Sequence, residues 1–421
     1  MITDFIWGKR KAKIKKEVII QNIENGGLKV PSFIDMIKAN KLSWVKRIID
    51  PAAKWNKIFE DLVSPISIFY FTTTSLDNEV IQSIPITFYQ QIYNVWNDFK
   101  PESNTPQEYV TENIWYNKYI KIASDNDRKR KHSFLWQSYY AAGLQKVKDL
   151  FRNDRTLISF DEFIRKYGGK CNFLQFQRLK KAIPKHWLDA ISNSSVVNFT
   201  DTETVCYCKI QNKMIDVRIV NTKMFYDMLI KMKYVKPTAI YRWNGLFEIH
   251  DTDWESILKL PYTATRETKL QSFQFKVIHR IIACKKWLYM QNILETDKCE
   301  TCNIEDNLIH FFVECRLVTT FWKMLENWWN RLAKNKVKIT TKHIIFGFYY
   351  DKSYFCNINY VIILAKWYIY RQKLKDGSIC FMNFIVELKN KLCIEEYICT
   401  KQGKHPQFVK KNGKTFTKTC K

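Results

Sequence analysis

The run Cys299–Cys302 (Cys-Glu-Thr-Cys), followed by His310 and then Cys315, carries the strongest structural signal in the chain. Three thiolates and one imidazole make a complete tetrahedral ligand set for a zinc ion. Because two residues separate the first two cysteines, one turn can present both sulfur atoms to one metal, and about one helical turn can bring His310 and Cys315 together. The spacing therefore predicts one bound zinc ion. Since protein fills all four positions, we expect this ion to be structural rather than catalytic.

Chance is the alternative explanation, because twelve cysteines offer several accidental pairs. No other cysteine pair, however, is accompanied by a second Cys/His pair at ligand spacing. The first residues do not resemble a secretory signal peptide, and no window of about 18 apolar residues is present. We therefore expect thiols or metal ligands rather than disulfides, no membrane insertion, and a location in the cytoplasm, the nucleus or both.

Charge indicates the class of partner. The 421 residues include 68 Lys and Arg against 41 Asp and Glu, which gives a net charge of +27. Such a protein binds polyanions through counterion release. Aromatic residues are also abundant, with 14 Trp, 22 Tyr and 28 Phe, and single-stranded nucleic acid stacks its bases on such rings. We therefore expect RNA or DNA as the partner, with an anionic membrane surface as the less favoured alternative.

Three groups of residues are candidates for nucleic-acid contacts. Trp7 lies beside a dense basic cluster, a run of four basic residues begins at Arg128, and His279 adjoins Arg280. Each group also has a plainer interpretation: a solvated surface for the first, an exposed loop or a nuclear localisation signal for the second, and a surface histidine for the third. The candidate contact residues are Trp7, Lys9, Arg10, Lys11, Lys13, Lys15, Lys16, Arg128, Lys129, Arg130, Lys131, His279 and Arg280.

Helical periodicity dominates the rest of the chain. The stretch Val205–Val220 alternates as two strands around the turn Gln211–Lys213, which predicts a β-hairpin. Two Ser/Thr-x-x-Glu patterns, Ser159–Glu162 and Thr252–Glu255, predict capping boxes that start helices. We therefore expect a mainly α fold: an elongated, multi-lobed helical chain with one small β-hairpin and a small CCHC zinc module.

Six segments carry a family resemblance: Phe5–Lys9, Asn25–Lys29, Lys41–Arg47, Phe273–Ile281, Cys299–Trp322 and Ile362–Arg371. In this order they resemble the part of LINE-type non-LTR retrotransposon reverse transcriptases that follows the polymerase palm. The first three resemble the segment directly after the palm, the fourth the helix before the zinc knuckle, the fifth the reverse-transcriptase zinc-binding module, and the last a helix that follows it. Two details depart from the family: the gap between Cys302 and His310 is a residue shorter than in many members, and the frequent Asn after the first Trp is absent.

The resemblance implies a thumb, a helical connector and a C-terminal zinc segment, the parts that grip template RNA and target DNA during target-primed reverse transcription. Combined with the composition, it predicts six segments along the chain. These are a thumb-like basic helical segment (1–50), a helical connector (51–200), a hairpin plus helices (201–295), a zinc-binding module of the reverse-transcriptase type (296–335), C-terminal helices (336–400) and a basic disordered tail (401–421).

Catalysis is not expected of this chain. Polymerisation requires paired aspartates that hold two metal ions, and the sequence contains no Asp-Asp pair and no segment resembling the family's endonuclease. We therefore expect a nucleic-acid-binding fragment of a reverse transcriptase that has no activity of its own. Two alternatives stay open: a zinc-stapled helical scaffold that binds protein, and a truncated gene model of a full RNA-directed DNA polymerase. Exposed aromatic rings with a concentrated basic groove would favour nucleic-acid binding, whereas evenly scattered charge and a large dry patch would favour the scaffold.

Overall fold

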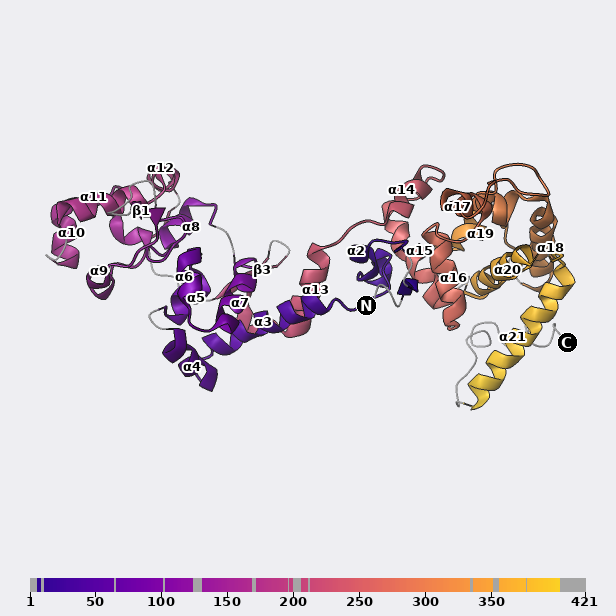
Figure 1. Cartoon of the computed structure of the whole chain (residues 1–421), viewed down its shortest axis with the longest axis horizontal. Helices are drawn as coiled ribbons and strands as arrows, with labels where there is room; N and C mark the ends of the chain where they lie inside the picture. Colours follow the sequence, from indigo (N-terminus) through magenta and orange to yellow (C-terminus); the bar gives the residue numbers. More distant parts are fainter. Residues whose placement is uncertain are drawn as a thin grey trace. The chain divides into compact units, whose positions relative to one another are not determined.

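The computed structural model describes residues 6–8, 11–63, 66–100, 103–123, 131–168, 172–195, 197–199, 206–210, 213–333, 336–350, 356–375 and 377–401. The chain forms two compact units, which are coloured along the sequence in Figure 1. Unit 1 comprises Met1–Pro31 and Lys233–Lys421, and unit 2 comprises Ser32–Met232. Helices dominate both units, and the strands form two-stranded antiparallel sheets, which confirms the predicted mainly α fold class.

Unit 2 is a helical unit with one hydrophobic core. Helix α3 lies against α13 and α7 and supplies core residues such as Leu42 and Val45. The elements of unit 2 are α3 (Phe33–Ile49), α4 (Lys54–Val63), α5 (Ile68–Thr73), α6 (Asn78–Ser83), α7 (Thr87–Asn97), α8 (Pro106–Thr111), β1 (Ile122–Ala123), β2 (Lys131–His132), α9 (Gln137–Ala141), η2 (Val147–Leu150), α10 (Phe160–Tyr167), α11 (Phe173–Ala182), α12 (Lys185–Asn193), β3 (Tyr207–Ile210), β4 (Lys213–Asp216), η3 (Val217–Ile219) and α13 (Thr222–Met232).

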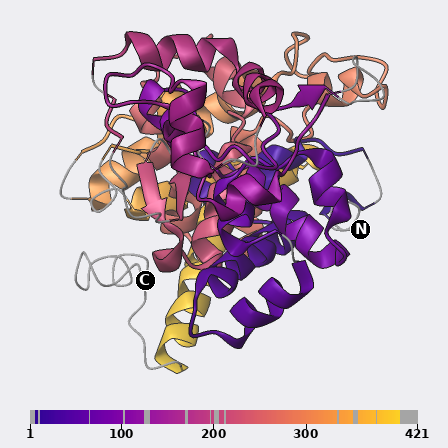
Figure 2. The same cartoon turned by 90° about the vertical axis from the view of Figure 1, so that its left-hand side faces the viewer.

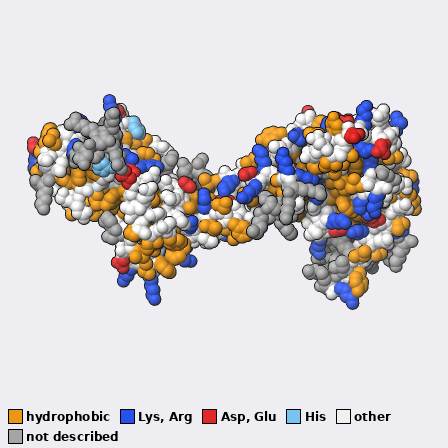
Figure 3. Space-filling view, in the orientation of Figure 1, with side chains coloured by type: hydrophobic (Ala, Val, Ile, Leu, Met, Phe, Trp, Pro, Cys, Tyr) orange, Lys and Arg blue, Asp and Glu red, His pale blue; other side chains and the backbone are white. Residues whose placement is uncertain are grey.

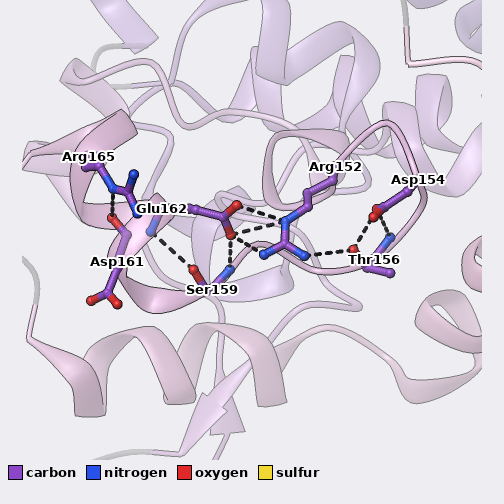
Figure 4. Close-up of polar contacts among 7 residues, drawn as sticks. All are labelled: Arg152, Asp154, Thr156, Ser159, Asp161, Glu162 and Arg165. Atoms are coloured by element: carbon purple, nitrogen blue, oxygen red, sulfur yellow. Dashed lines mark hydrogen bonds and ion pairs between the residues drawn. The ribbon is translucent and has the colours of Figure 1, made fainter.

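Side-chain capping fixes the start of α10, as the sequence predicts. The Glu162 N–H donates to Ser159 Oγ, and the Ser159 N–H donates to Glu162 Oε2 at 2.7 Å, so the capping box is confirmed. Figure 4 shows that Arg152 approaches the same carboxylate, with its Nε at 3.0 Å from Glu162 Oε1. These hydrogen bonds, with those from Arg152 the strongest, lower the pKa of Glu162 to about 2. The Glu162 carboxylate therefore serves to cap the start of α10.

The predicted hairpin is present in unit 2. Strands β3 and β4 pair in antiparallel fashion, with Tyr207 opposite Asp216 and Cys208 opposite Ile215. Cys208 is buried in the core, as expected for a small packing residue. The short pair β1 and β2, which joins Ile122 to His132, is an additional sheet that the sequence patterns did not indicate.

Unit 1 collects the N-terminal segment and the C-terminal half of the chain. Its last helix, α21, is the long yellow helix in Figure 2. No helix within the described ranges has both the length and the apolar character needed to cross a membrane. The elements of unit 1 are α2 (Lys16–Ile19), η1 (Ile23–Asn25), α14 (Thr238–Asn244), α15 (Asp251–Ala264), α16 (Thr268–Ile278), α17 (Lys285–Met290), η4 (His310–Glu314), α18 (Arg316–Leu332), α19 (Thr341–Phe346), α20 (Cys356–Leu374) and α21 (Phe381–Lys401).

Helix α20 lies in the core of unit 1 and contacts α15, α16 and α21. Its residues from Ile358 to Ile369 are nearly all buried, as expected for a helix that is apolar around its whole circumference. Lys366 is fully buried within it. Its Nζ donates to Gln274 Oε1 at 2.5 Å and to the Ile345 carbonyl at 3.0 Å, and burial lowers its pKa well below the ordinary value.

The second predicted capping box is wrong. Helix α15 begins at Asp251, with His250 rather than Thr252 at the cap position and no side-chain capping hydrogen bond. Glu255 instead pairs with Lys259 one turn later, at 2.5 Å between Oε1 and Nζ. The helix therefore starts two residues before the position that the box pattern indicates.

The N-terminal segment is held against unit 1 by a small apolar cluster and a tight turn. Ile14 and Val18 pack with Phe275 in this cluster. Gly26 has a φ of +83°, and a Cβ there would lie 2.7 Å from Pro237 Cγ, so only glycine allows this close approach. The turn fixes the basic segment next to the chain that leads into α14.

Candidate metal centre and basic pocket

A tight turn positions the first two cysteines. The Cys299 N–H donates to the Ile304 carbonyl at 2.8 Å, and the Asn303 N–H donates to the Cys299 carbonyl at 2.8 Å. Asn303 has a φ of 57°, a left-handed conformation that Asn adopts more readily than most residues. The chain therefore turns back directly after Cys302, which directs both sulfur atoms to one side of the loop.

A π-helical turn positions the other two candidate ligands. In η4 the Cys315 N–H donates to the His310 carbonyl at 2.9 Å, five residues earlier in the chain. This wider turn matches the five-residue spacing better than the regular helical turn that the sequence suggested, and single π-turns are frequent at functional sites. Phe311 and Phe312, between the two candidate ligands, are buried in the core of unit 1.

The four side chains converge on one point. The ligand atoms of Cys299, Cys302, His310 and Cys315 all lie within 4.8 Å of one another, close enough to hold a metal ion. The sulfur of Cys315 lies 3.9 Å from that of Cys299 and 3.8 Å from that of Cys302. A tetrahedron with Zn–S bonds of about 2.3 Å has edges of about 3.8 Å, so these separations are compatible with zinc.

Hydrogen bonding orients the imidazole. His310 Nδ1 lies 2.8 Å from Asp306 Oδ1, and His310 Nε2 is buried without a hydrogen-bond partner. A buried ring nitrogen without a hydrogen-bond partner is energetically costly unless it binds a metal. The position of His310 Nε2 is therefore typical of a metal-binding histidine. Asp306 is only 3% exposed, and its Oδ2 also accepts from the Lys285 N–H at 3.3 Å, at the start of α17. Sequence reasoning missed Asp306, although a carboxylate four residues before a ligand histidine is a usable signal.

The start of α18 supplies hydrogen bonds to the sulfur atoms. A hydrogen bond from the Arg316 N–H is the main cause that lowers the pKa of the Cys302 thiol to about 7. Burial raises the pKa of Cys315, and a hydrogen bond from the Leu317 N–H opposes this increase. Because backbone N–H groups at a helix start favour negative charge, the position suits thiolates.

The candidate metal centre packs against the core of unit 1. Trp322 Nε1 on α18 donates to the Phe312 carbonyl at 2.6 Å. From α20, Lys373 Nζ donates to the Phe311 carbonyl at 2.9 Å. These buried and half-buried contacts fix η4 between two long helices, so metal binding and the packing of this region should depend on each other.

Unit 1 also contains an open pocket with a volume of about 360 Å³ beside α2. It brings together parts of two predicted contact groups, the N-terminal basic cluster and His279. Lys15 and Lys16 are exposed, and no described carboxylate pairs with either of them. Lys236, in contrast, pairs with Asp251 at 2.7 Å. The main lining residues are Lys13, Lys15, Lys16, Lys236, Pro237 and His279.

The interpretation of His279 as a surface histidine is wrong. The side chain is only 7% exposed and packs on Phe275, with the ring centroids 4.2 Å apart. Burial is the main cause that lowers its pKa to about 4, and a hydrogen bond to the Gly26 backbone opposes this shift. Its Nε2 is buried without a partner. The N-terminal turn that covers this ring comes from a segment more than 200 residues away, which the local pattern around His279 could not reveal.

The remaining candidate contact residues are placed as follows. The Arg280 guanidinium lies 4.4 Å from the centroid of the Trp243 ring, and Lys13 Nζ lies 4.2 Å from that of Trp287. Trp7 is half-buried against the N-terminal apolar cluster, and Lys11 is exposed. The other predicted contacts lie outside the described residues, except for the backbone of Lys131 in β2; they are Lys9, Arg10, Arg128, Lys129 and Arg130.

A scan against known protein families finds no match for this chain, and no curated protein matches its sequence.

Proposed function

We propose that this chain is a nucleic-acid-binding part of a LINE-type reverse transcriptase, corresponding to the thumb, connector and zinc segment. The observation that carries the proposal is the meeting of Lys13, Lys15 and Lys16 at one pocket of unit 1. Figure 3 shows Lys and Arg side chains gathered in the region of α2. Next to the pocket, the Tyr241 ring is 62% exposed. A concentrated basic site beside an exposed ring supports single-stranded nucleic acid as the partner.

Zinc is the metal we propose for the Cys3His cluster, in a structural role. Three sulfur ligands and one imidazole nitrogen suit Zn²⁺, and four protein ligands would leave no position for a substrate. The ion would neutralise the thiolates and join the 299–302 turn to η4 and α18. Asp306 would hold the His310 ring so that Nε2 faces the metal.

The family assignment rests on the six sequence segments in their shared order. Five of them, all except Lys41–Arg47, lie in unit 1 with the candidate metal centre and the pocket. A polymerase palm upstream of Met1 in the same reading frame would support the assignment most directly. An upstream sequence from an unrelated domain would contradict it.

A salt titration of RNA binding tests the binding proposal. Replacing Lys11, Lys15 and Lys16 with Ala removes three exposed cations from one segment. If these side chains neutralise phosphates of single-stranded RNA, the slope of log affinity against log salt should fall by about 2 units in magnitude. The measurement is fluorescence anisotropy of a labelled oligonucleotide at several salt concentrations.

A matched variant separates local binding from diffuse charge. Lys54, Lys57 and Lys185 are exposed lysines of unit 2, and their replacement by Ala lowers the net charge by the same three units. The control should leave the salt slope close to that of the parent. Equal effects of the two triple variants would show that any part of a +27 protein binds RNA equally well, and the proposed site would be refuted.

We also propose that the chain performs no polymerisation by itself. Primer extension with an RNA template, Mg²⁺ and nucleotides should give no product, because the sequence lacks the paired aspartates that hold two metal ions. Extension that persists after removal of contaminating polymerases would contradict this part of the proposal.

A second candidate function, protein binding, is favoured by one observation in unit 2. Trp55, Ile58 and Leu62 lie along one side of α4 and are all exposed. Figure 3 shows hydrophobic side chains in the region of α4 and α7. Replacing the three side chains with Ser or Gln should improve solubility and leave RNA affinity unchanged if this row serves a protein partner.

A further inference from the structure

The basic pocket of unit 1 presents two kinds of chemical group. Lys15 and Lys16 offer positive charge and N–H donors, and Lys13 adds a third cation that also lies over the Trp287 ring. His279 lines the same pocket from the side of α16. A ligand that carried only negative charge would form ion pairs with the lysines but would donate no hydrogen bond to His279.

The tautomer of His279 follows from its contacts. The Gly26 N–H already donates to the Ile23 carbonyl, and the hydrogen bond between His279 and the Gly26 backbone favours the protonated ring. The ring therefore donates to the Gly26 carbonyl. Since Nε2 has no partner, Nδ1 is the donor, and in the neutral ring Nε2 is an acceptor. Burial lowers the pKa of His279 to about 4, so the ring is neutral near pH 7.

The pocket thus needs an anion for its lysines and a hydrogen-bond donor for His279. A ribose–phosphate unit supplies both, because its phosphate is anionic and its 2′-hydroxyl is a donor a few ångströms away. The DNA backbone provides the phosphate and lacks the hydroxyl. An acceptor left unpaired in a buried position is costly, so the difference between the two backbones is measurable.

An aromatic ring stands beside the pocket. Lys236 lines the pocket, and its Nζ lies 5.5 Å from the centroid of the exposed Tyr241 ring on α14. Base stacking on such a ring is independent of the sugar and tolerant of sequence. The ring is therefore placed to hold a base whose backbone lies along the lysines.

We propose that this pocket is a ribonucleotide subsite: Lys13, Lys15 and Lys16 bind a backbone phosphate, His279 Nε2 accepts from the ribose 2′-hydroxyl, and Tyr241 stacks a neighbouring base. The inference rests on the proposed nucleic-acid binding and adds a preference for RNA over DNA. His279 Nε2 is buried in the structure, so the proposal requires the pocket wall to open before the 2′-hydroxyl can reach this atom.

The experiment uses the full chain and a series of ten-residue oligouridines at one fixed salt concentration, measured by fluorescence anisotropy. The RNA should bind about 3- to 10-fold more tightly than the deoxyuridine oligomer, as expected for one hydrogen bond to a buried acceptor. The 2′-fluoro and 2′-O-methyl oligomers should bind like the deoxy oligomer, since neither can donate. This comparison changes only the ligand, so it does not depend on whether a variant folds.

Protein variants assign the preference to named side chains. His279→Phe should abolish the preference for RNA and leave the affinity for the deoxy oligomer unchanged, whereas His186→Phe, on an exposed histidine of unit 2, should preserve it. Tyr241→Ala should weaken RNA and DNA binding alike by about 10-fold. Circular dichroism with a thermal transition like that of the parent verifies folding.

The outcomes separate this inference from the proposed function. Equal affinity for RNA and the deoxy oligomer, with strong salt dependence, would overturn the ribonucleotide subsite and leave nucleic-acid binding in place. A preference that persists in His279→Phe would overturn the role of His279. A chain that binds neither oligomer at low salt would refute both proposals together.

Discussion

Asp306→Asn offers the sharpest test of the metal centre, because it alters no ligand. The Asp306 carboxylate holds His310 Nδ1 at 2.8 Å and accepts from the Lys285 N–H at 3.3 Å, while only 3% of the residue is exposed. Loss of such an outer partner of a metal-binding histidine typically weakens metal affinity by about 10- to 100-fold. That range corresponds to about 1.4–2.7 kcal/mol of binding free energy.

The effect on stability follows from mass action. At a free zinc concentration 100 times the parent Kd, the ion stabilises the native state by about 2.7 kcal/mol. A 30-fold weaker variant retains about 0.9 kcal/mol at the same concentration, so Asp306→Asn should lose about 1.8 kcal/mol of zinc-dependent stability. Competition with a chromogenic chelator measures the affinity, and thermal unfolding at buffered free zinc measures the stability.

Glu300→Gln is the matched control. Glu300 lies in the same loop and pairs with Lys285, and its side chain is 82% exposed. Its removal should leave zinc affinity within about twofold, because exposed ion pairs contribute little. If Asp306→Asn and Glu300→Gln bind zinc equally well, the carboxylate does not orient the imidazole and the argument is refuted.

Two further predictions concern buried polar groups of unit 1. Trp322→Phe leaves the Phe312 carbonyl without the Trp322 Nε1 hydrogen bond and should reduce the free energy of unfolding by about 1–3 kcal/mol. Chemical denaturation measures this change, and an unchanged free energy of unfolding would contradict the argument. Burial lowers the pKa of Lys366 in the folded state well below its ordinary value. Between these two pKa values the unfolded state binds one proton more than the folded state, so the free energy of unfolding increases as the pH rises. From pH 7 to 9, the free energy of unfolding of the parent should therefore rise relative to that of Lys366→Met, by at most about 1.4 kcal/mol per pH unit, and a constant difference would contradict the argument.

Local patterns were the predictable part of this molecule. The capping box at Ser159 and Glu162 and the hairpin of β3 and β4 each involve residues that are near neighbours in sequence. The turn and the π-helix that carry the four candidate ligands span only residues 299–315, so their spacing was sufficient to predict that the four side chains lie close together. Short-range geometry restricts such elements before any tertiary packing exists.

Tertiary packing decided what the patterns could not. Lys366 interrupts the most apolar window of the sequence, yet it is fully buried because Gln274 and Ile345, distant in sequence, supply acceptors for its Nζ. His279 lies off the apolar stripe of its helix and is covered by the turn at Gly26. In both cases the contacting residues come from a distant part of the chain, so neither composition nor periodicity could predict that these two side chains are buried.

The candidate metal centre and the basic pocket are connected through α17 within unit 1. Asp306 binds both His310 and the first turn of α17, and α17 presents Trp287, whose ring lies 4.2 Å from Lys13 Nζ at the pocket. Removal of the metal frees His310, weakens the hold of Asp306 on α17, and should thereby loosen the position of Lys13. Zinc removal should then lower RNA affinity and increase hydrogen exchange at residues 285–290 before that of α20. The basic pocket should lose the same affinity in Asp306→Asn at low free zinc, and regain it at saturating zinc. An RNA affinity that is unaffected by chelation would mean that the two sites are independent, with the metal serving only the fold of its own module.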